Sequence, residues 1–180
     1  MPALAPPRSR CLPVTAHARI RAPRDRVWAT IAAPGNLEAA HPYVKANPVE
    51  RWPGPDARDR IVYDSGLQLI REATAWHDGS DGEYGYDLAV WNRPGAVSRA
   101  RWRVTEEGPA ASRLTITIWP YLLASWPAGV RQLGQALAVR PAMRWYLRSV
   151  VLGFRHVVET GEPVQRNQFG WHPMFSARTR

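Results

Sequence analysis

The sequence contains a single cysteine, Cys11, among its 180 residues. One cysteine cannot form an intramolecular disulfide, and it cannot complete a cysteine-based metal site. The five histidines show no pair at metal-ligand spacing; they stand at positions 17, 41, 77, 156 and 172. We therefore expect no metal centre, and the lack of disulfides makes a reducing cytoplasm the simplest location for the chain.

Motifs that would identify several enzyme classes are also missing. The chain has no G-x-S-x-G nucleophile elbow, no phosphate-binding glycine loop and no dinucleotide-binding glycine pattern. The sequence therefore gives no support for nucleophilic hydrolysis or nucleotide chemistry, and it predicts no cofactor. The first residues also lack the apolar segment of a secretory signal peptide.

Acidic residues are scarce in the C-terminal part of the chain. The whole sequence has 24 basic and 15 acidic residues, a formal net charge of +9. Residues 110–180 hold nine of the basic residues but only two acidic ones, Glu159 and Glu162, so this part carries +7. Such asymmetry is typical of a surface that meets nucleic acid or an anionic membrane, although a solvated helix face gives the same pattern.

The length and the 45% hydrophobic content fit one domain with one buried core. Residues 1–13 are rich in proline and show no apolar period, so we expect a disordered leader. We expect the domain to occupy residues 14–164. The remaining residues, 165–180, form a C-terminal tail that we expect to pack in part, to about residue 176.

Alternation of apolar and polar residues predicts strands in the first two thirds of the chain. Val14 to Ile20 form the first strand, Pro23 starts a short helix, and a second helical turn follows at 36–40. A meander of strands separated by Gly and Pro turns is then expected at 44–52, 59–65, 67–77, 83–91, 96–106 and 112–119. The alternation assigns an inner face to the last three of these strands but gives no clear facing for 44–52 and 67–77.

The last third of the sequence predicts one long amphipathic helix. From Met143 to Val158, apolar residues recur at helical spacing along one stripe, and Gly161 fits the left-handed position past the helix end. A helical piece at 130–138 precedes it, and we expect a kink near Arg140-Pro141. This order indicates an α+β fold: a curved antiparallel β-sheet wrapped around a long C-terminal α-helix, with two short helices after the first strand.

Two local motifs support a family assignment. Ile20-Arg21-Ala22-Pro23, followed by Val27-Trp28, joins the first strand to a helix started by proline. The closing segment combines residues 159–164 with Asn167-Gln168-Phe169-Gly170. These motifs and the element order resemble the START-like helix-grip superfamily, also called SRPBCC, which includes polyketide cyclases, lipid-transfer domains and pollen-allergen-type binders. The resemblance covers about residues 14–176 and implies a helix-grip ligand-binding domain.

The function expected from this resemblance is binding or carriage of an apolar or amphipathic small molecule, lipid-like or polyketide-like, between the sheet and the C-terminal helix. Apolar walls supply affinity, and tyrosine hydroxyls set the orientation. The inward residues expected to line the cavity are Tyr84, Tyr86, Leu88, Trp102, Leu147, Val150, Val151 and Phe154. The alternative is a polyketide cyclase or dehydratase that uses His41 or a cavity tyrosine in proton transfer, although the sequence locates no acid–base partner for His41.

Charged residues within the expected strands suggest further contacts. Arg71 and Glu72 are adjacent, so one of them faces the interior, as a ligand anchor or as half of a structural ion pair. Asp87 lies between two inward positions and is expected on the outer face. Arginines at alternate positions from 99 to 103 form a basic strand face, but without a recognition motif or an exposed stacking platform we expect no nucleic-acid partner.

An aromatic segment lies between the last strand and the helical region. Pro120 and Pro127 force it off the sheet, and it contains the membrane-contact candidates Trp119, Tyr121, Leu122, Leu123 and Trp126. We predict a hydrophobic lip that touches an anionic membrane transiently, since tryptophan and tyrosine favour the headgroup layer. The alternative is that the segment folds back into the core. The two prolines argue against a membrane span, and the sequence does not determine the ligand or the oligomeric state.

Overall fold

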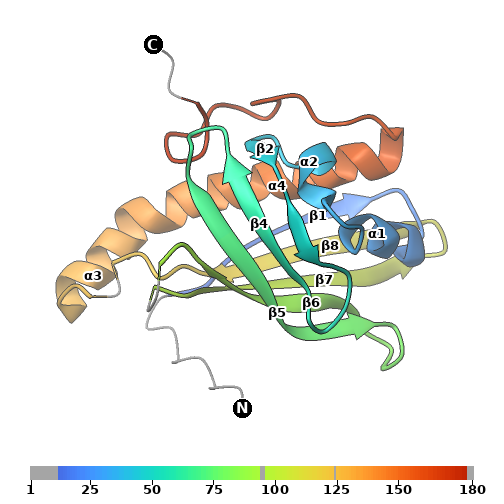
Figure 1. Cartoon of the computed structure of the whole chain (residues 1–180), viewed down its shortest axis with the longest axis horizontal. Helices are drawn as coiled ribbons and strands as arrows, with labels where there is room; N and C mark the ends of the chain where they lie inside the picture. Colours follow the sequence, from blue (N-terminus) through green and yellow to red (C-terminus); the bar gives the residue numbers. More distant parts are fainter. Residues whose placement is uncertain (1–11, 94–95, 124, 178–180) are drawn as a thin grey trace.

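Figure 1 shows the computed structural model of the protein, which describes residues 12–93, 96–123 and 125–177. The fold is α+β, with a curved antiparallel sheet around one long helix, as the sequence predicts. The elements in chain order are β1 (Val14–Ile20), α1 (Arg24–Ile31), α2 (Asn36–Ala40), β2 (Val44–Ala46), β3 (Val49–Arg51), β4 (Arg58–Tyr63), β5 (Gln68–Asp78), β6 (Tyr84–Trp91), β7 (Ser98–Gly108), β8 (Ala111–Trp119), α3 (Ala128–Gly134), the π-helical segment η1 (Gln135–Val139) and α4 (Arg140–Thr160).

The strands form one sheet in the order β1-β8-β7-β6-β5-β4-β2, with β3 paired to β4. The first strand returns to pair with the last, so β1 runs antiparallel to β8 from Val14 opposite Ile118 to Ile20 opposite Ser112. The predicted strand 44–52 is two short strands, β2 and β3. Pro48 lies between them and has no N–H with which to continue a sheet ladder.

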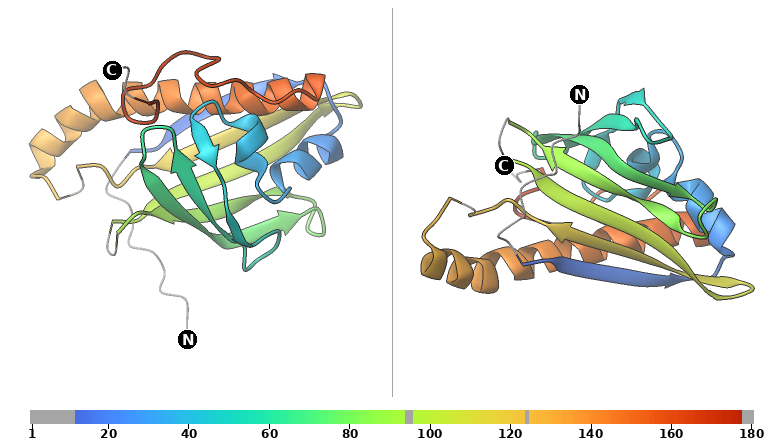
Figure 2. Two further views of the ribbon diagram at one scale, coloured as in Figure 1. Left: turned by 45° about the horizontal axis from the view of Figure 1, so that its top comes forward. Right: turned by 90° about the horizontal axis from the view of Figure 1, so that it is seen from below.

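Helix α4 lies along the concave side of the sheet and packs against β1, as both views of Figure 2 show. Its predicted apolar stripe is buried, because this is the face that meets the sheet; the buried apolar residues are Met143, Leu147, Val150, Val151, Phe154 and Val158. Gly161 ends the helix at a φ of 79°, the left-handed conformation that glycine adopts without a steric penalty.

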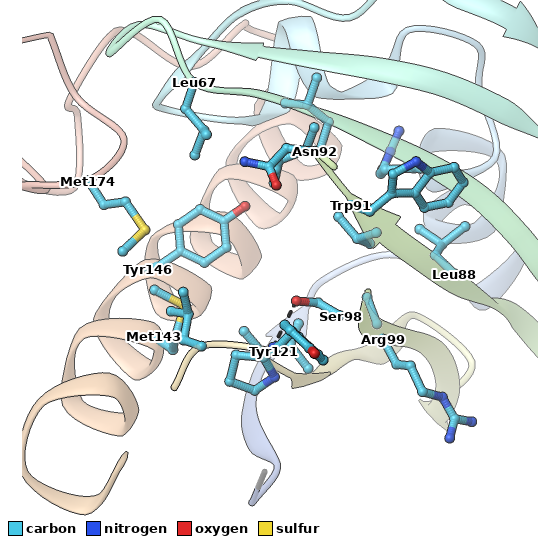
Figure 3. Close-up of a pocket in the computed structure, with 18 of the residues that line it drawn as sticks. Leu67, Leu88, Trp91, Asn92, Ser98, Arg99, Tyr121, Met143, Tyr146 and Met174 are labelled. Carbon is cyan, nitrogen blue, oxygen red and sulfur yellow. Dashed lines mark hydrogen bonds between the residues drawn. The ribbon is translucent and has the colours of Figure 1, made fainter. Parts of the chain in front are cut away.

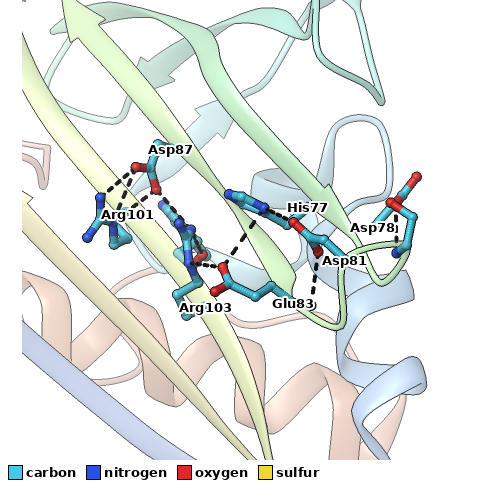
Figure 4. Close-up of polar contacts among 9 residues, drawn as sticks. His77, Asp78, Asp81, Glu83, Asp87, Arg101 and Arg103 are labelled. Carbon is cyan, nitrogen blue, oxygen red and sulfur yellow. Dashed lines mark hydrogen bonds and ion pairs between the residues drawn. The ribbon is translucent and has the colours of Figure 1, made fainter.

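The predicted facing of the central strands is confirmed. Tyr86 and Leu88 on β6, and Ala100, Trp102 and Val104 on β7, are all buried. Asp87 lies on the opposite, outer face, where it pairs with Arg101 and Arg103 (Figure 4). Partial burial would raise the pKa of Asp87, but the hydrogen bonds and positive charges of these two arginines lower it overall.

The helical region before α4 contains a π-helical segment in place of the kink that the sequence predicts near Arg140-Pro141. Helix α3, η1 and α4 follow one another without a break, and the irregularity is the π-helical segment Gln135–Val139 directly before Arg140-Pro141. Proline has no N–H to donate, and its ring clashes with the carbonyl four residues earlier. A wider π turn at this place accommodates both effects.

Two other segments pack on α4. Helix α2 approaches it so closely that a Cβ on Gly153 would lie 2.0 Å from the carbonyl oxygen of Ala40. The chain after α4 folds back, because the N–H of Val164 donates to the carbonyl of Ala39 at 2.8 Å and Phe175 is buried. Within the described ranges, no helix is both long and apolar enough to cross a bilayer.

Candidate functional site

A cavity of about 620 Å³ lies between the concave face of the sheet and helix α4. Its walls are mainly apolar, and they come from α2, the central strands and α4; they include Leu37, Ile61, Leu69, Leu88, Ile116 and Leu147. In Figure 3, Tyr146 on α4 lies across the cavity from Leu88 on β6, with Met143, Met174 and Tyr121 around one end. A cavity of this size and character fits a small organic molecule.

The residues predicted to line the cavity divide into two groups. Leu88, Trp102, Leu147 and Val150 lie on its wall. The other four lie outside the lining and belong to the packed core at the α1 end of the sheet; they are Tyr84, Tyr86, Val151 and Phe154. Both groups face inward, so strand alternation and helical spacing do not distinguish a filled part of the interior from a hollow part.

Aromatic packing explains why the α1 end is filled. The ring of Tyr86 stacks on Trp76 with centroids 5.2 Å apart, and its hydroxyl donates to the carbonyl of Ile31 at 3.3 Å. Phe154 meets Trp102 edge to face at 5.2 Å. Tyr84 lies 4.4 Å from the guanidinium of Arg24, which covers its ring. These contacts leave no space for a ligand beside Tyr86 or Phe154.

Three polar side chains form a hydrogen-bonded network at one end of the cavity. The Nδ1 atom of His41 accepts from the backbone N–H of Tyr43 at 3.2 Å, so in the neutral ring Nε2 carries the proton. Nε2 lies 3.0 Å from the hydroxyl of Tyr146, which lies 2.8 Å from the hydroxyl of Tyr63. The two tyrosines have two hydroxyl protons and share one hydrogen bond. One proton therefore has no acceptor among the described residues, and both hydroxyl-bearing side chains line the cavity.

His41 is held in its neutral form. Burial, followed by the positive charge of Arg71, lowers the pKa of His41 from 6.5 to about 3. Burial also raises the pKa of Tyr146 to about 12 and the pKa of Tyr63 well above its ordinary value. At neutral pH the network is uncharged, and His41 is a weak base.

A buried arginine lies beside this network. Arg71 on β5 donates from Nε to Oδ1 of Asp59 at 2.8 Å and from Nη2 to Oδ2 of the same carboxylate, and it also lines the cavity. Burial by itself would lower the pKa of Arg71, but the hydrogen bond and charge of Asp59 raise it overall. Nη1 is buried and has no hydrogen-bond partner among the described residues. Of the adjacent residues Arg71 and Glu72, Arg71 is therefore the one that faces the interior. It forms half of an ion pair with Asp59, and its Nη1 donor has no partner among the described residues.

The aromatic segment after β8 frames one end of the cavity. Tyr121, Leu122, Leu123 and Trp126 line the cavity, and all but Leu123 are exposed on their outer side. Trp119 lies apart from them at the end of β8, where the guanidinium groups of Arg99 and Arg101 are each 5.7 Å from its ring.

Tyr63 and Tyr146 are not among the site residues predicted from the sequence, and Arg71 has two possible roles there. Tyr146 lies three residues after Met143 of the apolar stripe, and Tyr63 follows Ile61 on the inner face of β4. A tyrosine on a buried face is a signal for a polar group in the interior, because its hydroxyl needs a partner. That signal does not show that the two hydroxyls meet each other and His41, since the three residues lie far apart in the sequence.

Comparisons with known proteins agree with this architecture. Among solved structures, the chain is similar to a Helicobacter pylori protein, jhp0584 (TM-score 0.66, 12% identity, 85% of this chain and 91% of the other), and to TTHA0849 from Thermus thermophilus (0.61, 20%, 82% and 97%). It is also similar to the di-domain ARO/CYC BexL from the BE-7585A biosynthetic pathway (0.59, 13%, 81% and 45%). No curated protein sequence matches the chain.

The sequence profile of the family described as polyketide cyclase / dehydrase and lipid transport matches residues 12–159. This match covers most of the chain and includes every strand, together with most of α4. The solved structures share the same fold, including Ara h 8.0201 at a TM-score of 0.54. The chain belongs to the polyketide cyclase/dehydrase and lipid transport family, within the SRPBCC superfamily.

Proposed function

We propose that the protein binds and carries an amphipathic small molecule in the cavity between the sheet and α4. The observation that carries this proposal is a chamber of about 620 Å³ with mainly apolar walls and with the hydrogen-bonded network of His41, Tyr146 and Tyr63 at one end. Burying the apolar body of a ligand there contributes about 25 cal/mol per Å² removed from water. The polar end then fixes the orientation of the ligand.

The polar end offers a donor to a ligand oxygen. One hydroxyl proton of the Tyr63–Tyr146 pair has no acceptor among the described residues, and both residues line the cavity. The charge of Arg71 is already offset by Asp59, and His41 is neutral. A carboxylate would place a second buried anion beside one cation, which is unfavourable. A neutral acceptor, such as a ketone or ester oxygen, therefore fits this end of the cavity.

Native mass spectrometry of the purified protein, with extraction of co-purified compounds, tests the proposal. We expect wild type to retain an apolar or amphipathic compound. The variant Val150→Trp places a large side chain in the cavity and should lose it, whereas Val49→Trp, on exposed β3, should keep it. If wild type and Val150→Trp retain the same compound in equal amounts, the cavity is not the binding site.

A cyclase- or dehydratase-type reaction is the second candidate. It is favoured by the hydrogen-bonded network of His41, Tyr146 and Tyr63, which reaches the cavity and contains protons that a substrate could exchange. The pKa of His41, about 3, weighs against it as a general base near neutral pH. We expect no turnover of aromatic β-keto substrates. Turnover that is lost in His41→Gln while substrate binding persists would establish the enzyme instead of the carrier.

A further inference from the structure

Helix α3 projects beyond the sheet (Figures 1 and 2), and apolar side chains in and directly after it are exposed. The exposed fractions are 53% for Val130, 62% for Leu133 and 72% for Leu137; we call these three residues the α3 ridge. Trp126, at 48% exposure, lies two residues before α3. Leu122 lies near η1, because its carbonyl accepts from the Gln135 side chain. An exposed series of this kind marks an interaction surface.

Basic side chains follow the α3 ridge along the same continuous helix. Arg140, Arg144 and Arg148 stand one turn apart on α4, and with Trp145 they line a shallow surface hollow. No ion pair involves these three arginines within the part of the chain that the structure describes. No acidic residue occurs in the sequence between Glu107 and Glu159. The positive charge of this surface is therefore not neutralised locally.

We propose that the α3 ridge and the arginines of α4 form a docking surface for an anionic lipid bilayer. The ridge enters the boundary between headgroups and acyl chains, and Arg140, Arg144 and Arg148 contact the lipid phosphates. Leu137 and Arg144 are seven residues apart, which corresponds to about 10 Å along a helix. This short separation lets the ridge and the arginines contact neighbouring parts of one membrane surface.

The charge pattern selects a bilayer over a second copy of the chain. A symmetric dimer uses the same surface on both subunits, so it would bring two sets of unpaired arginines together. An anionic bilayer instead supplies phosphates for the arginines and an apolar layer for the ridge. Trp126 and Trp145 suit the headgroup region, where an apolar ring with a polar N–H is favoured.

Docking in this way would also place the cavity mouth against the lipid. Leu122 and Trp126 belong both to the exposed surface and to the lining of the cavity. The inference does not rest on the identity of the cavity ligand, because the ridge and the arginines are outside the cavity.

Co-sedimentation with vesicles tests the proposal, using phosphatidylcholine alone and phosphatidylcholine mixed with phosphatidylglycerol. We expect binding only to the mixed vesicles and a decrease as salt is added. Arg144→Gln/Arg148→Gln should lower the partition coefficient about thirtyfold at low salt, since each basic residue near an anionic surface is worth roughly a factor of five. Leu133→Gln/Leu137→Gln should also weaken binding, and both pairs are exposed, so the fold should persist.

The charge-matched control is Lys45→Gln/Arg60→Gln, which removes two exposed positive charges from β2 and β4. We expect this variant to bind mixed vesicles within about twofold of wild type, apart from a small long-range effect. Equal losses in the control and in Arg144→Gln/Arg148→Gln would show attraction by net charge alone and would overturn the proposal. Absence of wild-type binding at low salt would also overturn it. A dimer in sedimentation velocity that Leu133→Gln/Leu137→Gln abolishes, without vesicle binding, would assign the ridge to self-association.

Discussion

At the polar end of the cavity, a buried arginine has one nitrogen without an acceptor among the described residues. Nη1 of Arg71 is buried without a hydrogen-bond partner in the described part of the chain, while the other guanidinium donors are satisfied by Asp59 and Asn36. The guanidinium carbon lies 4.9 Å from the centre of the Trp52 ring. An unsatisfied buried donor costs about 1–3 kcal/mol, so this nitrogen lowers the stability of the folded protein.

The hydroxyl of Tyr63 should contribute to the recognition of a ligand oxygen. We expect wild type to bind 2-acetylnaphthalene more tightly than 2-ethylnaphthalene, which has a similar shape but no oxygen. Tyr63→Phe removes the hydroxyl and should reduce this preference by about 2- to 10-fold, the range of one hydrogen bond. Quenching of tryptophan fluorescence measures both affinities, because Trp102 lies in the cavity wall.

Tyr43→Phe is the matched control for this experiment. The hydroxyl of Tyr43 donates to Ser149 or to the carbonyl of Gly170, and the residue lies outside the cavity lining. The ketone preference should be unchanged in this variant. A preference that persists in Tyr63→Phe, or that falls equally in Tyr43→Phe, would contradict direct recognition by Tyr63.

Stability at acidic pH should depend on His41. The pKa is about 3 in the folded protein and near 6.5 in the unfolded chain, so the unfolded chain binds the extra proton between these values. The stability contributed by neutral His41 is complete above about pH 6.5 and is lost as the pH falls toward 3. In this window the free energy of unfolding should decrease by about 1.4 kcal/mol per pH unit from this group.

Urea denaturation between pH 6 and pH 4 measures this dependence. His41→Gln should show a shallower decrease than wild type, because glutamine does not titrate. His17 lies on the exposed face of β1, so His17→Gln serves as the control and should keep the wild-type slope. Identical slopes for wild type and His41→Gln would show that His41 is not held neutral in the folded protein.

At the scale of elements, the buried face of α4 has two different surroundings along its length. Near its start, Met143, Tyr146, Leu147 and Val150 line the cavity. Near its end, Phe154 and Val158 are buried in the packed core, and Gly153 admits α2 at close range. A single apolar stripe therefore lines the cavity at one end and belongs to the packed core at the other.

Shortening a buried side chain near the end of α4 should destabilise the fold. Phe154→Ala should lower the free energy of unfolding by about 3–5 kcal/mol, since Phe154 is fully buried against Trp102 and outside the cavity. Arg148→Ala, on the exposed side, should change it by less than about 0.5 kcal/mol. Chemical denaturation of both variants compares the two faces. Similar midpoints for the two variants would contradict this placement of the helix.

At the scale of the whole molecule, the sheet and α4 enclose the cavity while the projecting α3 end remains uncovered. The filled aromatic core at the α1 end supplies stability, and the hollow end is free to hold a ligand. The surface proposed for bilayer docking lies at this second end. The packed core and the proposed binding cavity therefore occupy different halves of the fold.

Ligand binding should stabilise the whole fold. A compound that binds only the folded state adds about 2.7 kcal/mol at a concentration one hundred times its Kd. We expect 2-acetylnaphthalene to raise the Tm of wild type and to leave that of Val150→Trp unchanged. Differential scanning fluorimetry measures both, with Val49→Trp as the control that should respond like wild type. Equal shifts in all three proteins would indicate binding outside the cavity.

The sequence by itself determined the fold class, the facing of the central strands and the apolar stripe of α4. These features depend on local periods: an inward Trp102 alternates with outward Arg101 and Arg103, and the residues from Met143 to Val158 repeat at helical spacing. The family match agrees with the resemblance drawn from the opening and closing motifs.

Only the tertiary structure decided which inward residues are packed and which line a cavity. Tyr86 and Leu88 have the same facing on one strand, but Tyr86 is covered by Trp76 while Leu88 borders the hollow. The contacts of Tyr63 with Tyr146 and of Arg71 with Asp59 likewise join separate elements. Such contacts depend on how strands and helices pack across long sequence separations, which local periodicity does not encode.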